Sequence, residues 1–259
     1  MKQKKMKNFG GSNTDSGALL ILISIVSAFF LWFLLTRFKY FSAFLSSPEE
    51  VVATLISRLE SGYFWPDVII SLQRIFKGYF IGMLTAIPVA FLMGWYRPLR
   101  SLVEPWIQFL RTIPPIAYIP IMVVAFGVGE DSKVAIIALA SFLACSITVM
   151  QGILETDATL IKAAFTFGAN DADLFLYVVL PASTPYIMIA ARTALAGSFT
   201  TLIAAEMTGA TAGLGARIQL ASSAARIDLV ILCILVIGVL GFIFDRILLH
   251  IEKIVTRWK

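Results

Sequence analysis

The chain has 259 residues, of which 59% are hydrophobic and only 14% are charged, and its mean hydropathy is +0.87. Because soluble domains carry about 25% charged residues, this composition excludes an ordinary soluble protein and places the chain in a membrane. The net charge of +5 is accounted for by basic loops on one side of the membrane, so no nucleic-acid partner is expected.

Six segments are apolar enough, and close enough to the roughly 20 residues that cross a bilayer, to be transmembrane helices. They cover residues 18–35, 78–96, 112–129, 134–154, 185–205 and 229–244, the last with an extension to residue 251. No soluble domain is left between them. The sequence therefore predicts an all-α membrane protein, with a basic tail over residues 1–17 and a single transmembrane domain over residues 18–259.

Lys and Arg residues in the loops predict how these helices are oriented. With the N-terminus in the cytoplasm, eleven of the loop cations lie on the cytoplasmic side and six on the other side. Cytoplasmic loops carry the excess of Lys and Arg in membrane proteins. Both termini are therefore expected to be cytoplasmic.

Two external segments are expected to be partly helical. After the first span, Ser47 suits an N-cap, Pro48 suits the first helical position, and Glu49 and Glu50 fill the first turn of an amphipathic helix. Between the fifth and sixth spans, residues 207–228 are small and Gly-rich. They predict an external loop with a short helix.

The third span, residues 112–129, contains Pro114, Pro115 and Pro120. Each proline removes a backbone donor and so frees a carbonyl group. Within a bilayer, a freed carbonyl is tolerated only against other protein or a water-filled cavity. This span is therefore expected to be buried in the assembly or to line a path.

Ionisable residues inside membrane spans are expensive to bury and are functional candidates by default. Arg111 and Arg192 are the clearest, followed by Glu104 and Glu206. One interpretation is a path for a hydrophilic solute that is lined by Arg111, Thr112, Arg192, Thr193, Thr200 and Glu206. The alternative, which the sequence leaves open, is that Arg192 pairs internally with a helix-end carbonyl or with Glu206.

The residues that most enzyme chemistry needs are missing. His250 is the only histidine, so His-based catalytic sets and paired-His metal sites have no partner. Neither a GxxxxGK[ST] phosphate loop nor a Gly-x-Ser-x-Gly motif occurs. Cys145 and Cys233 fall within apolar spans, where cysteine acts as a small hydrophobic residue. The chain is expected not to be an enzyme and to hold no cofactor or metal of its own.

A polar segment, residues 157–180, separates two of the apolar spans. Asp157 can cap a short helix, Gly168 can supply a left-handed turn, and Asn170 can cap a second short helix. Pro181 is expected to end or kink that second helix. The segment therefore predicts a helical hairpin on the cytoplasmic side.

The hairpin also carries the residues of a known motif. Permease subunits of binding-protein-dependent ABC importers share a cytoplasmic motif of the form E-A-A-x3-G-x9-I-x-L-P. Its spacing is matched here by Lys162, Ala163, Ala164, Gly168, Val178, Leu180 and Pro181. Two positions depart from the motif, since Lys162 replaces the acidic residue and Val178 replaces the isoleucine. The segments SLQRIFKGYFIGMLTAIPVAFLMG, LRTIPPIAYIPIMVVAFGVGEDSK and TAGLGARIQLA also resemble the nitrate, sulfonate, taurine and bicarbonate branch of this family.

The resemblance implies a type I ABC importer permease fold with six transmembrane helices, in a bacterial plasma membrane. It implies a coupling helix that docks on a cytoplasmic ATPase through Lys162, Ala163, Ala164, Gly168, Ala169, Asn170, Asp171, Leu180 and Pro181. The expected partners are an ABC ATPase dimer that binds ATP and Mg²⁺, an extracytoplasmic solute-binding protein, a second permease copy and membrane lipid. The expected function is ATP-driven import of a small hydrophilic solute, either a sulfonate-like, nitrate-like or taurine-like anion or a vitamin precursor.

Two other functions stay open from the residues alone. A channel or secondary carrier that needs no ATPase could use the same intramembrane charges. An integral membrane enzyme is opposed by the missing catalytic sets. Arg111 and Arg192 do not by themselves establish an anionic solute.

Overall fold

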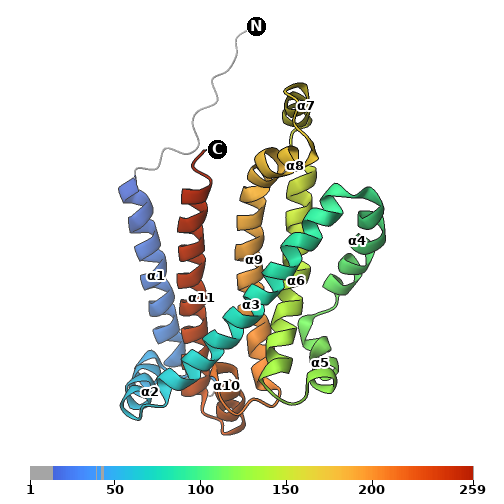
Figure 1. Cartoon of the computed structure of the whole chain (residues 1–259). Helices are drawn as coiled ribbons and strands as arrows, with labels where there is room; N and C mark the ends of the chain where they lie inside the picture. The colour runs from blue at the N-terminus through green and yellow to red at the C-terminus, as the bar shows by residue number, and fades with distance from the viewer. Residues whose placement is uncertain (1–13, 39, 42–43, 259) are drawn as a thin grey trace.

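The computed structural model describes residues 14–38, 40–41 and 44–258, and every regular element within them is a helix. Five helices are long and apolar enough to cross a membrane. They are α1 (Thr14–Thr36), α3 (Phe64–Trp95), α6 (Glu130–Leu154), α9 (Leu180–Met207) and α11 (Ile227–Val255) (Figure 1). The predicted all-α membrane fold is confirmed, while most of the expected basic tail, residues 1–13, lies outside the described residues.

The remaining span is a bent pair of helices. α4 (Arg97–Thr112) is followed, after a break, by the 3-10 helix η1 (Pro115–Tyr118) and by α5 (Ile119–Phe126), and the two arms meet at 99°. Ile113 and Pro114 are extended, with ψ of 124° and 135°, because a residue that precedes a proline is pushed out of the helical region. The predicted number of six spans is confirmed when the two arms of the bent pair are counted as one span. Residues 112–129, however, do not form one continuous helix.

Short helices mark the two ends of the molecule (Figure 1). α7 (Ala158–Thr166) and α8 (Asp171–Leu174) lie at the end where α1 begins and α11 stops, and we call it the α7 end. α2 (Pro48–Glu60) and α10 (Leu214–Ser223) lie at the opposite, α10 end. The helices predicted after the first span and before the last are therefore present, and Ser47 forms a capping box with Glu50.

The centre of the molecule is built from α3, α6 and α9. Gly82 of α3 lies so close to α6 that a Cβ atom there would be 2.5 Å from the carbonyl oxygen of Ala138. A Cβ atom on Gly78 would likewise be 2.6 Å from Cβ of Ile137. Because lipid supplies no hydrophobic force between helices, membrane helices associate through such close contacts at small residues.

α1 is packed far less than the other long helices. Its side chains from Leu19 to Leu31 are all exposed. Near its α10 end, the Trp32 indole N–H donates a hydrogen bond of 3.1 Å to the carbonyl of Ser46. α1 is thus attached mainly at one end.

Buried charges join the central helices near the α10 end. The Arg74 side chain of α3 is 4% exposed and donates from Nη1 to Oε1 of Glu206 on α9 at 2.6 Å. Its Nε donates to Oε2 of Glu130, at the start of α6, also at 2.6 Å. A third bond, of 2.7 Å, reaches the carbonyl of Ala212. One guanidinium therefore holds α3, α6, α9 and the loop before α10, as a buried charge requires full pairing.

The first backbone amides of α10 belong to the same cluster. The N–H groups of Gly213 and Gly215 donate to Asp67 at 3.0 Å and to Glu206 at 2.7 Å. These amides at the start of a helix have no partner within it, so carboxylates of α3 and α9 replace the missing acceptors. Arg217 of α10 donates to Asp67 at 2.6 Å, and this hydrogen bond raises the pKa of Arg217.

Gly213 is the position in this cluster where a side chain has no room. Its φ is +115°, and a Cβ atom would lie 2.6 Å from Cδ of Glu206 and 2.7 Å from Nη1 of Arg74. We predict that Gly213→Ala lowers the free energy of unfolding by about 3 kcal/mol or more, because it forces a buried ion pair apart. Thermal unfolding of the purified protein in detergent measures the effect.

Gly209→Ala provides the matched control. Gly209 also has a positive φ, of +79°, but the nearest atom to its Cβ position is 3.9 Å away. The control therefore carries backbone strain alone, about 1–2 kcal/mol. Equal losses of stability in the two variants would contradict a rigid cluster around Gly213.

Candidate functional site

The polar segment between α6 and α9 is a capped hairpin. The Asp157 carboxylate caps α7 by accepting the Thr159 N–H at 2.8 Å, and this bond lowers the pKa of Asp157. Gly168 supplies the left-handed turn with a φ of +84°. Asn170 and Asp173 then form a reciprocal capping box at the start of α8. The predicted caps and the predicted glycine turn are confirmed.

The exit from the hairpin differs from the prediction. Pro181 does not end a helix: α8 continues through a π-helical turn, Phe175–Val179, directly into α9. Pro181 lies directly after the π-helical turn, and its missing N–H leaves one carbonyl of the preceding turn without a helical donor. Ser183 and Thr184 donate their hydroxyls to the Leu180 carbonyl at 3.1 and 3.0 Å. The hairpin is therefore joined to α9 without a break in the helical run.

The tip of the hairpin presents apolar side chains outward. Phe167 is 90% exposed, and Leu160 and Phe165 are more than half exposed. Most motif residues are exposed with them, namely Lys162, Ala163, Gly168, Asn170 and Asp171, whereas Ala164, Ala169, Leu180 and Pro181 are half-buried. No described residue covers this apolar tip. At an end of the molecule that meets water, apolar side chains in such a patch would normally be buried.

The base of the hairpin is packed on the central helices. The Phe175 ring lies 5.0 Å from that of Phe91 and 5.9 Å from that of Trp95 on α3, centroid to centroid. On the α6 side, the Tyr186 hydroxyl donates to the Glu155 carboxylate. The base of the hairpin is therefore in contact with α3, and the Tyr186–Glu155 hydrogen bond joins α9 to the end of α6 beside it.

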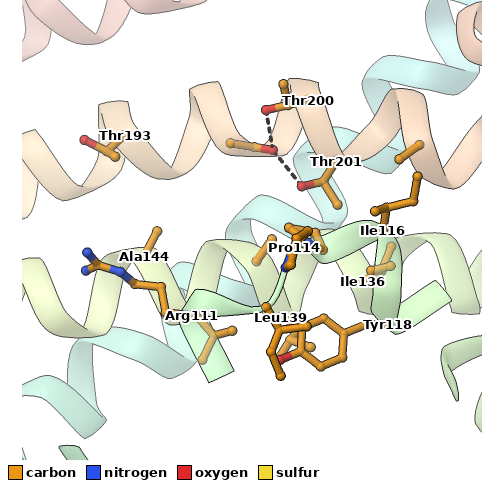
Figure 2. Close-up of a pocket in the computed structure, with 16 residues that line it drawn as sticks. Arg111, Pro114, Ile116, Tyr118, Ile136, Leu139, Ala144, Thr193, Thr200 and Thr201 are labelled. Atoms are coloured by element: carbon orange, nitrogen blue, oxygen red, sulfur yellow. Dashed lines mark hydrogen bonds between the residues drawn. The ribbon is translucent and has the colours of Figure 1, made fainter. Parts of the chain in front are cut away.

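A half-open pocket of about 380 Å³ lies between the helices (Figure 2). Its walls come from the break between α4 and η1, from the middle of α6 and from α9. They are formed by Arg111, Ile113, Pro114, Pro115, Ile116, Tyr118, Ile136, Leu139, Ala140, Leu143, Ala144, Thr193, Gly197, Thr200, Thr201 and Ala204. The proline-broken span therefore lines a cavity, as its freed carbonyls require.

The pocket is mainly apolar, with one cation at its wall. The threonine hydroxyls of α9 donate back to carbonyls of their own helix, for example Thr193 to Ile189 at 2.9 Å and Thr201 to Gly197 at 2.8 Å. Arg111 is exposed and makes no ion pair with any described residue. The pocket thus offers one unpaired positive charge beside an apolar wall.

The structure separates the residues that were predicted to line one path. Arg111, Thr193 and Thr200 meet at the pocket, whereas Thr112 lies outside it and donates to the Phe109 carbonyl at 2.7 Å. Glu206 lies in the buried cluster at the α10 end.

Arg192 faces α11 and lies outside the pocket walls. It donates to Asp245 at 2.9 Å and to Glu252 at 3.1 Å. Arg192 is therefore paired internally, as the alternative held, but its partners are Asp245 and Glu252, whereas Glu206 is paired with Arg74. Both carboxylates that pair with Arg192 belong to the last helix, where they continue the apolar span.

Sequence reasoning missed most of the buried cluster. Arg74 lies only four residues before the predicted start of the second span, and α3 extends that helix back to Phe64. Asp67, Ser71 and Arg74 recur at helical spacing within an apolar context, which was a usable signal of one polar face. Their partners on α9 and α10 carried no such signal.

No group of three or more metal-ligating side chains is found within the described ranges. The features described are the hairpin with its exposed apolar tip, the π-helical turn that leads into α9, and the pocket with one wall on α9.

Comparison with known proteins gives the family. The model of the family "Binding-protein-dependent transport system inner membrane component" matches residues 78–257. A probable ABC transporter permease protein of Brucella abortus is 39% identical, covering 94% of this chain and 97% of its own length. The taurine transport system permease protein TauC of Escherichia coli is 32% identical, over 93% and 88% of the two chains.

A solved structure supports the fold independently. An inward-facing MetNI methionine ABC transporter matches with a TM-score of 0.66 at 20% identity, over 75% of this chain and 98% of that one. Permeases named for taurine, aliphatic sulfonates and bicarbonate occur together among the relatives, as the resemblance of the motifs had indicated. The chain therefore belongs to the family of inner-membrane components of binding-protein-dependent transport systems, in the nitrate, sulfonate, taurine and bicarbonate branch, and is a permease subunit of an ABC importer.

Proposed function

We propose that this permease works as a pair of identical chains on two cytoplasmic ABC ATPase subunits and imports a small organic anion. In this arrangement the α7 end, with both termini, faces the cytoplasm. A solute-binding protein meets the α10 end. The observation that carries the proposal is the capped hairpin with an uncovered apolar tip at the α7 end.

The tip is suited to dock on another protein. It is a nine-residue helix that is fixed at its start by Asp157 and followed by Gly168. Its exposed phenylalanines, Phe165 and Phe167, are residues that gain most from burial in a partner's cleft. Since the chain has no phosphate loop, the energy for transport comes from the protein that receives this tip.

A second copy completes the path. The pocket has walls on α4, η1, α6 and α9 only. Beside it, the outer faces of the bent pair expose large apolar side chains, including Leu102, Trp106, Phe109, Ile121 and Val124. Two copies that meet along these faces cover them and enclose the pockets between the subunits.

The positive charge of Arg111 favours a negatively charged solute. Arg74 and Arg192 are each neutralised by two carboxylates, whereas Arg111 keeps its charge at the pocket. An anion that passes Arg111 would leave its apolar part against Ile116 or Leu139. Sulfonates have both features, and relatives named for taurine and for aliphatic sulfonates support this class.

The docking of the hairpin can be tested at Gly168. We predict that Gly168→Val abolishes co-purification of the ATPase, because a β-branched residue at a φ of +84° reshapes the turn below the tip. The matched control is Gly127→Val, at the other end of α6, with a φ of +81° and equally open space around its Cβ position. Pull-down of the ATPase with tagged permease measures the outcome, and equal recovery with both variants would refute the docking role.

The role of Arg111 can be tested by removing its charge. We predict that Arg111→Gln lowers uptake of a sulfonate at least tenfold per assembled complex, since one charge-assisted contact is worth about 1.5–3 kcal/mol. Arg97→Gln, an exposed arginine on the same helix and away from the pocket, should leave uptake within twofold. Uptake into proteoliposomes is the measurement, and unchanged transport in Arg111→Gln would rule out this arginine as part of the path.

The pocket itself can be filled. Gly197 lines it, and a Cβ atom there meets nothing within 4 Å, so Gly197→Leu is expected to fold, to retain the ATPase and to block uptake. Gly238→Leu places the same side chain on α11, also in open space, and should leave uptake intact. Normal uptake in Gly197→Leu would show that solute does not pass this pocket.

A further inference from the structure

The last three turns of α11 carry basic side chains on one face. Arg246, His250 and Lys253 follow the spacing i, i+4 and i+7, which places them in one row along the helix, and Arg257 follows two residues after α11 ends at Val255. All four are exposed. We call this row the basic stripe; it lies at the α7 end of the molecule (Figure 1).

Within the described part of the chain, no acidic side chain pairs with the cations of the basic stripe. The acidic residues nearest in sequence, Asp245 and Glu252, are half-buried and pair with Arg192 of α9. Arg246, Lys253 and Arg257 make no ion pair with any residue that the structure describes. The helix thus turns its acids toward α9 and presents its cations to the surroundings.

An apolar groove adjoins the stripe on its membrane side. The groove is a shallow, open depression on the surface of α11, and the residues that line it all belong to that helix: Phe242, Ile243, Arg246, Ile247, His250 and Ile251. The Arg246 guanidinium lies 4.7 Å from the centre of the Phe242 ring and marks the border between the two surfaces. Along α11, the apolar surface of the groove is therefore followed directly by the basic side chains of the stripe.

The stripe lies at the depth of lipid headgroups. α11 has 29 residues and so spans about 43 Å, whereas the hydrocarbon core is about 30 Å thick. If Ile227 marks one surface of that core, about 20 residues bring the helix to the other surface near Ile247. Lys253 and Arg257 then lie among the phosphates, and Trp258, 61% exposed, lies at the interface that tryptophan prefers.

We propose that the basic stripe and its groove form a binding site for an anionic phospholipid of the cytoplasmic leaflet. The phosphate binds among His250, Lys253 and Arg257, beyond Arg246 at the border, and one acyl chain lies on Phe242, Ile243 and Ile247. Clusters of basic residues directly cytoplasmic of a membrane helix attract such lipids. This inference rests on the proposed orientation, with the α7 end in the cytoplasm.

The order of chemistry along the groove identifies a lipid as the occupant. A free phosphate would use the cations but leave the apolar groove uncovered. The ATPase is expected at the α7 tip, and α9 stands between α7 and α11 (Figure 1). A phospholipid satisfies the cations and the groove together.

The test compares two matched pairs of charge removals in the intact permease–ATPase complex. One variant is Lys253→Gln with Arg257→Gln. The control is Arg97→Gln with Arg100→Gln, which removes two cations from the start of α4 at the same end of the molecule. Each complex is equilibrated with equal amounts of phosphatidylglycerol and phosphatidylcholine, and bound lipid is counted by native mass spectrometry.

We expect the stripe variant to lose its preference for phosphatidylglycerol at least tenfold, since each surface cation contributes about a fivefold factor. The control should change by less than twofold. An equal loss in both variants would mean general charge attraction and overturn the site, as would an unchanged preference in the stripe variant. Displacement of the lipid by millimolar inorganic phosphate would assign the stripe to a free anion instead.

The same preparations separate this inference from the proposed function. Retention of the ATPase and of the second permease copy in the stripe variant, together with loss of the lipid, supports the lipid site. Loss of the second copy would assign the stripe to a subunit contact and reject the proposal. Loss of the ATPase from the wild-type complex would count against the coupling hairpin, whatever lipid is bound.

Discussion

The fold depends on one buried cation. Arg74 enters the membrane domain on α3, and burial of an unpaired guanidinium would oppose folding strongly. The guanidinium has acceptors for its hydrogen bonds only when α6 supplies Glu130, α9 supplies Glu206 and the loop before α10 supplies the Ala212 carbonyl. This constraint brings together four separate parts of the chain at the α10 end. The glycines of α3 and the small residues of α6 then allow the backbones to approach below it.

The cluster also makes the two ends of the molecule differ in how they are held together. At the α10 end, helices are tied by charges that would be costly to separate, so this end acts as a frame. At the α7 end, the hairpin stands out from the bundle and is joined to it through Phe175 and Tyr186. The bent pair α4–α5 lies between these ends and lines the pocket through its proline break. Force applied to the hairpin would therefore reach the pocket through α9 and α3 while the α10 end keeps its shape.

The helices at the periphery of the molecule are packed less closely than those at its centre. α1 is exposed along most of its length and α11 exposes one long face, so both border on lipid in a single subunit. Inward, α11 uses two acids to hold Arg192, and outward it presents the basic stripe. The same three helical turns thus serve packing on one face and the membrane surface on the other.

The sequence by itself determined the helical class, the spans, the caps of α2, α7 and α8, and the hairpin with its glycine turn. Each of these follows from interactions among residues that are near in sequence: hydropathy over about 20 residues, a capping side chain two or three residues from its amide, or a proline next to its neighbour. The residues that line the proposed solute path were predicted less well. Arg192 and Arg111 look alike in sequence, but α11 brings Asp245, 53 residues away, to one of them and leaves the other at the pocket. The pairing of Arg74 with Glu206, 132 residues apart, was decided only by tertiary structure, because no local pattern shows which buried charges will meet when helices pack.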